Sequence, residues 1–303
     1  MLFQSWAFGS GAEGPHVLVT GGVHGDEYEP MAALRGLASL LSGRKLRGRV
    51  TLIPVVNEEA FRLGSRTASD GLDLARTFPG RSDGSITERV AHTLTPLIRS
   101  ADAYVDLHTG GERLQVYPLC GYMLHQNPGV LDRQRRLARA FGLPILWGTD
   151  ASLEGRSLSV ARDANVPAIY AEYLGGGCDR RGVDAYVHGC LNVLTDLGLL
   201  EGEVDWPRAE PLIVEDGRAG SGHMQVRNPA PRDGFFEPAV ALGERVRVGQ
   251  SLGTIADPLG RELTAVPSDS SGIVLVLRRL PRIAVGESVA VVLDADGTPP
   301  WTG

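Results

Sequence analysis

Short apolar runs alternate with helix-like stretches through the first half of the chain. The apolar runs cover residues 16–20 (HVLVT), 50–56 (VTLIPVV), 103–107 (AYVDL) and 168–174 (AIYAEYL). Apolar residues recur every three or four positions over residues 34–41, and residues 87–98 form a second helical stretch. Because apolar runs that alternate with helices are typical of a largely parallel sheet, the pattern predicts an α/β fold with a mixed, mostly parallel sheet flanked by helices.

The pattern changes near residue 206, where Trp206 and Pro207 interrupt the helical periodicity. From His223 onward the chain consists of short β-rich runs punctuated by glycine and proline, such as SGIVLVLRRL and VGESVAVVL. The sequence therefore predicts two domains, an α/β domain over residues 1–205 and a small all-β barrel or sandwich domain over residues 206–303.

Composition and charge narrow the class of protein. The 303 residues are 43% hydrophobic and 22% charged, which is typical of a folded globular chain. Basic residues number 30 against 36 acidic ones, and the net charge of −6 argues against a nucleic-acid partner. No apolar stretch is long enough for a membrane span, and the first residues do not resemble a signal peptide. Three cysteines without CxxC spacing favour the reducing cytoplasm.

The segment GGVHGDE, residues 21–27, follows the first predicted strand and precedes a predicted helix. Ligands of doubly wound sheets bind at this place, outside the carboxyl ends of the strands. His24 and Glu27 lie three positions apart on a glycine-rich turn, so an imidazole and a carboxylate can converge on one metal ion. An isolated HxxE pair is common by chance, and the pair alone does not establish a metal site.

A third ligand is available at the end of another predicted strand. His108, in DLHTGG, follows the run at residues 103–107. Two histidines and one carboxylate, with a fourth position open, make up the ligand set of several hydrolytic zinc sites. The sequence therefore offers His24, Glu27 and His108 as candidate ligands of a metal ion.

A hydrolytic zinc site also needs a general base and groups that hold the substrate. Glu172 lies near the end of the apolar run AIYAEYL, where burial would raise its pKa toward a useful value. Arg62, Arg66 and Arg76 lie in the loop after the second predicted strand, and guanidinium groups suit a carboxylate or an oxyanion. The alternative is that Glu172 is exposed and that the three arginines are ordinary surface residues. Lys45 is the only lysine in this chain, so arginine also takes the surface positions that lysine fills in other proteins.

Four segments, in this order, resemble the succinylglutamate desuccinylase/aspartoacylase family of the zinc-carboxypeptidase superfamily. They are GGVHGDE, DLAR with the following FPG, DLHTG and AEYLGG. The resemblance extends over about residues 15–200, and the combination is more specific than any single motif. It implies a zinc-carboxypeptidase-like fold with one Zn²⁺ per chain, held by His24, Glu27 and His108.

The resemblance also implies a role for each candidate residue. Glu172 is expected to activate water and then to protonate the leaving amine. Arg66 is expected to polarise the scissile carbonyl, and Arg76 to bind a substrate carboxylate. Arg162, ten residues before Glu172, resembles a further carboxylate-binding arginine of the aspartoacylase branch. The chain departs from the family at Ala75, where DLAR replaces the common DLNR, and this departure concerns the substrate rather than the metal chemistry.

The β-rich C-terminal segment resembles the barrel-sandwich domain of bacterial deacylase-like members of the family. Related biotinyl and lipoyl domains carry their cofactor on a lysine, and no lysine follows Lys45, which excludes such a carrier role. We expect this domain to cap the active-site cleft or to support a homo-oligomer.

These observations predict a zinc-dependent hydrolase of linear amides that removes the acyl group from an N-acyl amino acid or a similar small molecule. A metallo-carboxypeptidase or amidase acting on short peptides would use the same metal site. A non-catalytic binding protein with the same fold is a third hypothesis. The presence of all four candidate residues, His24, Glu27, His108 and Glu172, argues against it. The acyl group, the amino acid and the oligomeric state stay open.

Overall fold

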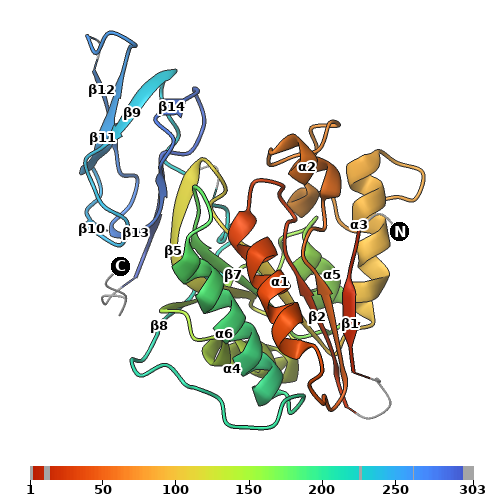
Figure 1. Cartoon of the computed structure of the whole chain (residues 1–303). Helices are drawn as coiled ribbons and strands as arrows, with labels where there is room; N and C mark the ends of the chain where they lie inside the picture. Colours follow the sequence, from red (N-terminus) through yellow and green to blue (C-terminus); the bar gives the residue numbers. More distant parts are fainter. Residues whose placement is uncertain (1–2, 10–13, 225–226, 262, 296–303) are drawn as a thin grey trace.

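A computed structural model describes residues 3–9, 14–224, 227–261 and 263–295 (Figure 1). Its α-helices are α1 (Tyr28–Leu41), α2 (Glu58–Leu63), α3 (Ile86–Arg99), α4 (Pro128–Phe141), α5 (Ser157–Asp163) and α6 (Arg180–Asp196). The strands of the first two thirds are β1 (Trp6–Phe8), β2 (His16–Thr20), β3 (Arg49–Ile53), β4 (Ala103–His108), β5 (Leu114–Met123), β6 (Ile145–Thr149), β7 (Ala168–Leu174) and β8 (Leu212–Glu215). The later strands are β9 (Gly234–Pro238), β10 (Arg245–Val246), β11 (Ser251–Ala256), β12 (Thr264–Pro267), β13 (Gly272–Arg278), β14 (Arg282–Ile283) and β15 (Ala290–Leu293).

A mixed sheet forms the centre of the molecule. Its main path runs β1-β3-β2-β4-β7-β5-β13-β10, and β6 and β8 continue from β5. The pairs β3–β2, β2–β4, β4–β7, β5–β6 and β6–β8 are parallel, while β5 runs antiparallel to β7. The predicted α/β class with a mostly parallel sheet is confirmed, and the runs predicted at residues 16–20 and 168–174 coincide with β2 and β7.

Helices cover both faces of this sheet (Figure 1). On one face α1, α4 and α6 pack on the sheet through buried residues such as Leu37, Phe141 and Tyr186. On the other face α3 and α5 contribute Leu94 and Val160 to a second apolar core. Both faces of the parallel strands are therefore buried, which explains why these strands are apolar without alternation.

Local capping signals set the ends of two helices near the site. Ser85 and Glu88 form a capping box at the start of α3, with each side chain accepting a hydrogen bond from the other residue's backbone N–H. At the start of α2 the Asn57 side chain accepts a hydrogen bond from the N–H of Ala60 at 3.2 Å. Gly64 ends α2 in the left-handed conformation, with φ of 59°.

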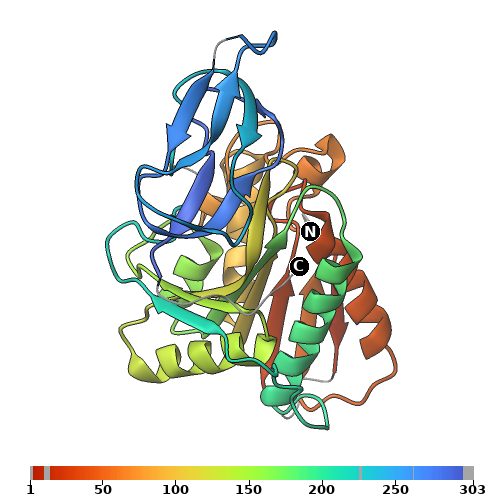
Figure 2. The same ribbon diagram turned by 90° about the vertical axis from the view of Figure 1, so that its left-hand side faces the viewer.

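The C-terminal strands divide between two sheets. β13 pairs antiparallel with β5, placing Val276 opposite Val116, and β10 and β15 both pair with β13. β12, β11, β9 and β14 form a separate four-stranded sheet in that order. Figure 2 shows these strands above the edge of the main sheet. The predicted β-rich C-terminal region is thus confirmed, but four of its strands, β8, β10, β13 and β15, belong to the central sheet.

The division expected at residue 206 falls before β8, whose residues 212–215 pair with β6 of the central sheet. Because of this pairing β8 belongs to the central sheet, although the expected boundary would assign it to the C-terminal domain. None of the helices within the described residues has both the length and the apolarity needed to cross a membrane.

Candidate metal centre and active-site cavity

The loop between β2 and α1 brings two candidate ligands to the carboxyl end of the sheet. His24 and Glu27 are both buried there, and Glu27 is the residue directly before α1. The loop is pressed against α2: a Cβ atom added to Gly25 would lie 2.1 Å from the carbonyl carbon of Ala60. A residue larger than glycine cannot occupy this position unless the loop moves, so the glycine of HGDE holds the two ligands against α2.

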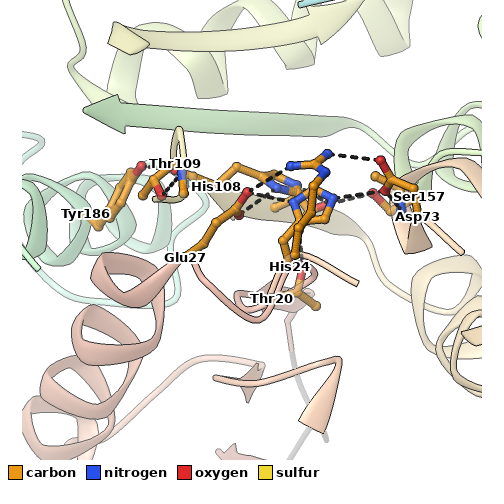
Figure 3. A network of polar contacts seen from close by, with 12 residues as sticks. Thr20, His24, Glu27, Asp73, His108, Thr109, Ser157 and Tyr186 are labelled. Atoms are coloured by element: carbon orange, nitrogen blue, oxygen red, sulfur yellow. Dashed lines mark hydrogen bonds and ion pairs between the residues drawn. The ribbon is translucent and has the colours of Figure 1, made fainter. Parts of the chain in front are cut away.

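His24, Glu27 and His108 converge in space (Figure 3). Nδ1 of His24 lies 2.6 Å from Oε1 of Glu27, and Nδ1 of His108 lies 3.1 Å from Oε2 of the same carboxylate. One ligand atom from each of the three side chains lies within 4.8 Å of the other two. The two imidazoles hold the pKa of Glu27 at about 2 although burial opposes this, so its carboxylate is ionised.

The second ring nitrogen of each imidazole, Nε2, faces a carboxylate other than that of Glu27. Nε2 of His24 lies 3.0 Å from Asp73, and Nε2 of His108 lies 3.1 Å from Asp106. Asp106 also accepts a hydrogen bond from the hydroxyl of Ser157 at 2.5 Å. Carboxylates in this position fix the tautomer that leaves Nδ1 free to bind a metal, and they orient the rings. The arrangement of donors therefore fits a divalent cation bound by two nitrogens and one carboxylate.

Glu172 lies beside this cluster because of strand register. In the parallel pair β4–β7 it is opposite His108, so both side chains project from the same face of the sheet. Glu172 is 6% exposed, and its Oε2 atom has no hydrogen-bond partner among the described residues. Burial and the negative charge of Glu27 raise the pKa of Glu172 to about 8, against the attraction of His108.

A cavity opens onto the three ligand residues and Glu172. Its apolar wall consists of Leu114, Val116, Leu158, Tyr170, Met224 and Val276. Val276 belongs to β13, so the C-terminal part of the chain completes this wall. Ala75 also lines the cavity, at the position where the sequence departs from the family pattern.

Three arginines line the same cavity. Arg66 donates a hydrogen bond to Asp73 at 3.0 Å and lies 3.8 Å from Glu27. Arg76 donates to the carbonyl of Ala75, and Arg156, at the start of α5, has a weak contact of 3.4 Å with a backbone carbonyl. Burial and then the nearby charge of Arg76 lower the pKa of Arg156 to about 10, so both groups stay cationic at neutral pH. Two neighbouring cations of this kind favour an anionic ligand.

Comparison with known proteins places this site in a family. The model of the succinylglutamate desuccinylase/aspartoacylase catalytic domain matches residues 13–185. The chain belongs to this family. The matched range contains the three candidate metal ligands and the candidate general base, which are His24, Glu27, His108 and Glu172.

Individual family members resemble the chain over nearly its whole length. It is 34% identical to N-alpha-acetyl-L-2,4-diaminobutyric acid deacetylase of Halomonas elongata over 299 residues, covering 93% of this chain and 83% of that protein. The structure of a succinylglutamate desuccinylase/aspartoacylase from Rhodobacter sphaeroides has a TM-score of 0.84 at 29% identity, with 97% of this chain and 89% of that chain covered. The product-bound ectoine utilization protein EutE (DoeB) from Ruegeria pomeroyi also has a TM-score of 0.84 at 29% identity, with 95% and 87% covered. These relatives support a deacylating hydrolase.

Two arginines that we expected to bind substrate lie outside the cavity of this family member. Arg62, in the last turn of α2, has a side chain that is 73% exposed and pairs with Glu58 at 2.9 Å. Arg162, in α5, pairs with Glu154 and Asp163 at 2.7 and 2.8 Å. Neither lines the cavity, because both guanidinium groups are directed to carboxylates close to them in sequence.

Sequence reasoning assigned no role to Asp73, Asp106 and Arg156. Asp106 stands two residues before His108 on the same strand, so period-two alternation was a usable signal that the two share a face. Asp73 was visible within DLAR, but only the fold brings it to His24. Arg156 lies before a short helix in an irregular region, and no local pattern distinguishes it from the other arginines of the chain.

Proposed function

We propose that this protein is a zinc-dependent amidohydrolase that removes the acyl group from an N-acyl amino acid or a similar small N-acyl compound. The observation that carries the proposal is the convergence of His24, Glu27 and His108 next to Glu172, a buried carboxyl group with a raised pKa. One zinc ion per chain is expected at these three ligands, because two nitrogens and a carboxylate suit zinc. When bound, such an ion polarises a carbonyl and lowers the pKa of water.

Glu172 supplies the proton transfers in this proposal. Its carboxylate lines the cavity and can accept a proton from the water that attacks the amide carbon. As the C–N bond breaks, the same carboxyl group returns that proton to the leaving nitrogen, so that an amine and a carboxylic acid are released. A carboxyl group with a raised pKa suits both steps, because it is a stronger base than an exposed carboxylate and still a competent acid.

The arginines divide between the reacting carbonyl and the rest of the substrate. Arg66 lies beside Glu27 and Asp73, where its guanidinium can stabilise the negative charge that develops on the carbonyl oxygen. Arg76 and Arg156 form no ion pair within the described part of the chain, and together they can bind the carboxylate of an amino acid. The apolar wall of the cavity suits the acyl group.

The proposal is tested by metal content and amine release on one preparation. We expect about one zinc ion per chain, and release of amine from one class among N-acetyl, N-succinyl and N-formyl amino acids. A chelator should abolish this release and added zinc should restore it. Unchanged turnover after complete metal removal would contradict the proposal, and cleavage of short peptides alone would favour the carboxypeptidase alternative.

Substitution Glu172→Gln separates the chemical step from metal binding. The amide keeps the size of the side chain but cannot accept the proton, so kcat should fall by about 10²- to 10⁴-fold while zinc stays bound. Glu203→Gln, at an exposed position far along the chain, is the matched control and should leave kcat unchanged. Full activity of the Glu172→Gln variant would remove Glu172 from the mechanism.

A further inference from the structure

Tyr170 lies on the side of Glu172 that is away from the candidate metal ligands. These ligands come from the ends of β2 and β4, and the sheet continues from β4 to β7 and then to β5. Tyr170 precedes Glu172 by two positions on β7, so the two side chains share a face, and both line the cavity. The ring of Tyr170 extends over the next strand, because a Cβ atom added to Gly121 of β5 would lie 2.1 Å from it. A ligand that extends from the metal centre past Glu172 therefore reaches Tyr170.

The hydroxyl group of Tyr170 has no hydrogen-bond partner among the described residues. The residue is 8% exposed, yet its hydroxyl oxygen is not one of the unpartnered side-chain atoms that are sealed from solvent. It is the one hydroxyl group on the otherwise apolar wall of the cavity. Burial and then the charge of Glu172 raise the pKa of Tyr170 against the effect of Arg156, so the hydroxyl keeps its proton and can donate it in a hydrogen bond.

Arg156 supplies a second donor next to this hydroxyl. Both residues line the cavity, and they are close enough for each to affect the pKa of the other. The guanidinium of Arg156 has a weak contact of 3.4 Å with the carbonyl of Gly222 and pairs with no carboxylate of the described residues. A ligand that satisfies a guanidinium and a neighbouring hydroxyl needs negative charge and two acceptor oxygens, and a carboxylate provides both.

The direction of the proposed reaction places the amino acid at this end of the cavity. Glu172 protonates the leaving nitrogen, so this nitrogen lies on the Glu172 side of the reacting carbonyl. The amino acid bonded to the nitrogen then extends past Glu172, away from the metal ligands. Its α-carboxylate is bonded to the carbon atom next to that nitrogen, which brings the carboxylate toward Arg156 and Tyr170.

We propose that the hydroxyl of Tyr170 donates a hydrogen bond to the α-carboxylate of the substrate, beside Arg156, and so selects substrates in which this carboxylate is free. The hydroxyl adds one directional donor to the charge of the arginine. Gly121 is part of the device, because a larger residue at this position would displace the ring of Tyr170. The inference rests on the proposed deacylase function and names a further residue that determines its specificity.

Tyr170→Phe tests the assignment, because it removes the hydroxyl and keeps the ring over Gly121. The probes are N-acetylalanine and N-acetylalaninamide, which differ only in the carboxylate. For the acid we expect kcat/KM to fall by about 10- to 100-fold, mainly through KM, since a hydrogen bond to a charged group is lost. For the amide the loss should stay below about fivefold, since a hydrogen bond to a neutral group contributes less.

Tyr122→Phe is the matched control. Tyr122 follows Gly121 on β5 but belongs to the apolar core on the opposite face of the sheet, where its hydroxyl donates to Glu215 at 2.8 Å. This variant loses one tyrosine hydroxyl from the same region of the sheet and should change kcat/KM for neither substrate.

A binding measurement keeps the inference independent of turnover and of the acyl group. By calorimetry on the zinc-loaded proteins, free alanine should bind at least about tenfold more weakly to Tyr170→Phe than to the wild type, and alaninamide should show less than about a fivefold difference. Equal losses for acid and amide, or no loss for either, would overturn the inference and leave the deacylase function intact. Absence of hydrolysis of any N-acyl amino acid, together with the selective loss of alanine binding, would instead remove the proposed function and support the carboxylate contact.

Discussion

His24 and His108 each face Glu27 with one ring nitrogen and a second carboxylate with the other. This arrangement holds the rings in place before an ion arrives, because Asp73 and Asp106 fix both the tautomer and the orientation. Asp106 is held in turn by Ser157 and by its buried position on β4. Its pKa is lowered below the usual value, since the neighbouring His108 and the hydroxyl donors outweigh the effect of burial.

Asp106→Asn should weaken zinc binding without removing a ligand. The amide can still accept a hydrogen bond, but it loses the charge that makes the imidazole of His108 a stronger donor to the ion. We expect zinc affinity to fall by about 10- to 100-fold, measured by competition with a chelator of known affinity. Asp132→Asn on α4, whose side chain is largely exposed, should leave the affinity unchanged. An affinity equal to that of the wild type in Asp106→Asn would show that the carboxylate does not support the ligand.

Residues next to strand ends could be found from the sequence, whereas of the cavity-lining arginines outside the strands Arg66 and Arg76 were predicted and Arg156 was not. His24, Glu27, His108 and Glu172 carry local signals, because each follows or ends an apolar run and lies in a glycine-rich context. Arg156 carries no such signal, since its position depends on how residues 150–156 cross the cavity. Arginine is abundant in this chain, so residue type alone could not separate Arg156 from Arg62 or Arg162.

At the scale of elements, the loop that carries Asp73 and Arg76 is tied to α3. Asp70 accepts hydrogen bonds from the N–H and the hydroxyl of Thr87, in the first turn of that helix, at 3.0 and 2.8 Å. Burial would raise the pKa of Asp70, but the bonds from Ser85 and Thr87 outweigh it and lower the pKa below 3.8. The same carboxylate thus caps a helix and fixes the start of a loop that leads to the site.

Asp70→Asn should destabilise the protein in a pH-dependent way. A carboxyl group whose pKa is lower in the folded state stabilises that state above its unfolded pKa, and this contribution is lost as the pH falls. Near neutral pH we expect a loss of about 1 kcal/mol in the free energy of unfolding, measured by urea denaturation. The difference from the wild type should shrink below about pH 4. Asp83→Asn, exposed in the same region, should have no such effect, and a pH-independent loss in Asp70→Asn would contradict the explanation.

Strands that are continuous apolar runs could be predicted from the sequence, and a strand that contains proline and glycine could not. The bounds of β2 and β7 follow directly from their apolar runs. The segment LQVYPLCGYM of β5 contains Pro118 and Gly121, which usually argue against a central strand. In the fold the register with β7 shifts between Val116 and Leu119, where Pro118 is accommodated, and Gly121 is required because the ring of Tyr170 lies against it.

At the scale of the whole molecule, the two parts of the chain share one apolar core. Val276, Val291 and Leu293 of the C-terminal strands belong to the same buried cluster as Leu119 and Trp147 of the α/β part. The prediction of a separate β domain could not anticipate this, because the pairing of β13 with β5 joins segments that are far apart in sequence. Hydrophobic periodicity identifies a strand but does not reveal its distant partner.

The shared core predicts cooperative unfolding. We expect one calorimetric transition for the intact chain, with equal calorimetric and van't Hoff enthalpies. Val276→Ala should lower the stability of that whole transition by about 1–3 kcal/mol, because it removes buried methyl groups from the common core. Two separate transitions, or a variant that shifts only one of them, would show that the C-terminal strands fold on their own.

The pairing of β13 with β5 also sets the order in which the enzyme can be completed during synthesis. The ribosome delivers the candidate metal ligands and Glu172 long before residues 272–278 emerge. Until then Leu114–Val116 lacks the neighbour that β13 provides, and the cavity lacks the wall that Val276 contributes. An unpaired strand edge can template pairing with other chains. A chain released early would therefore carry every proposed catalytic group and still be an incomplete, aggregation-prone protein rather than a smaller enzyme.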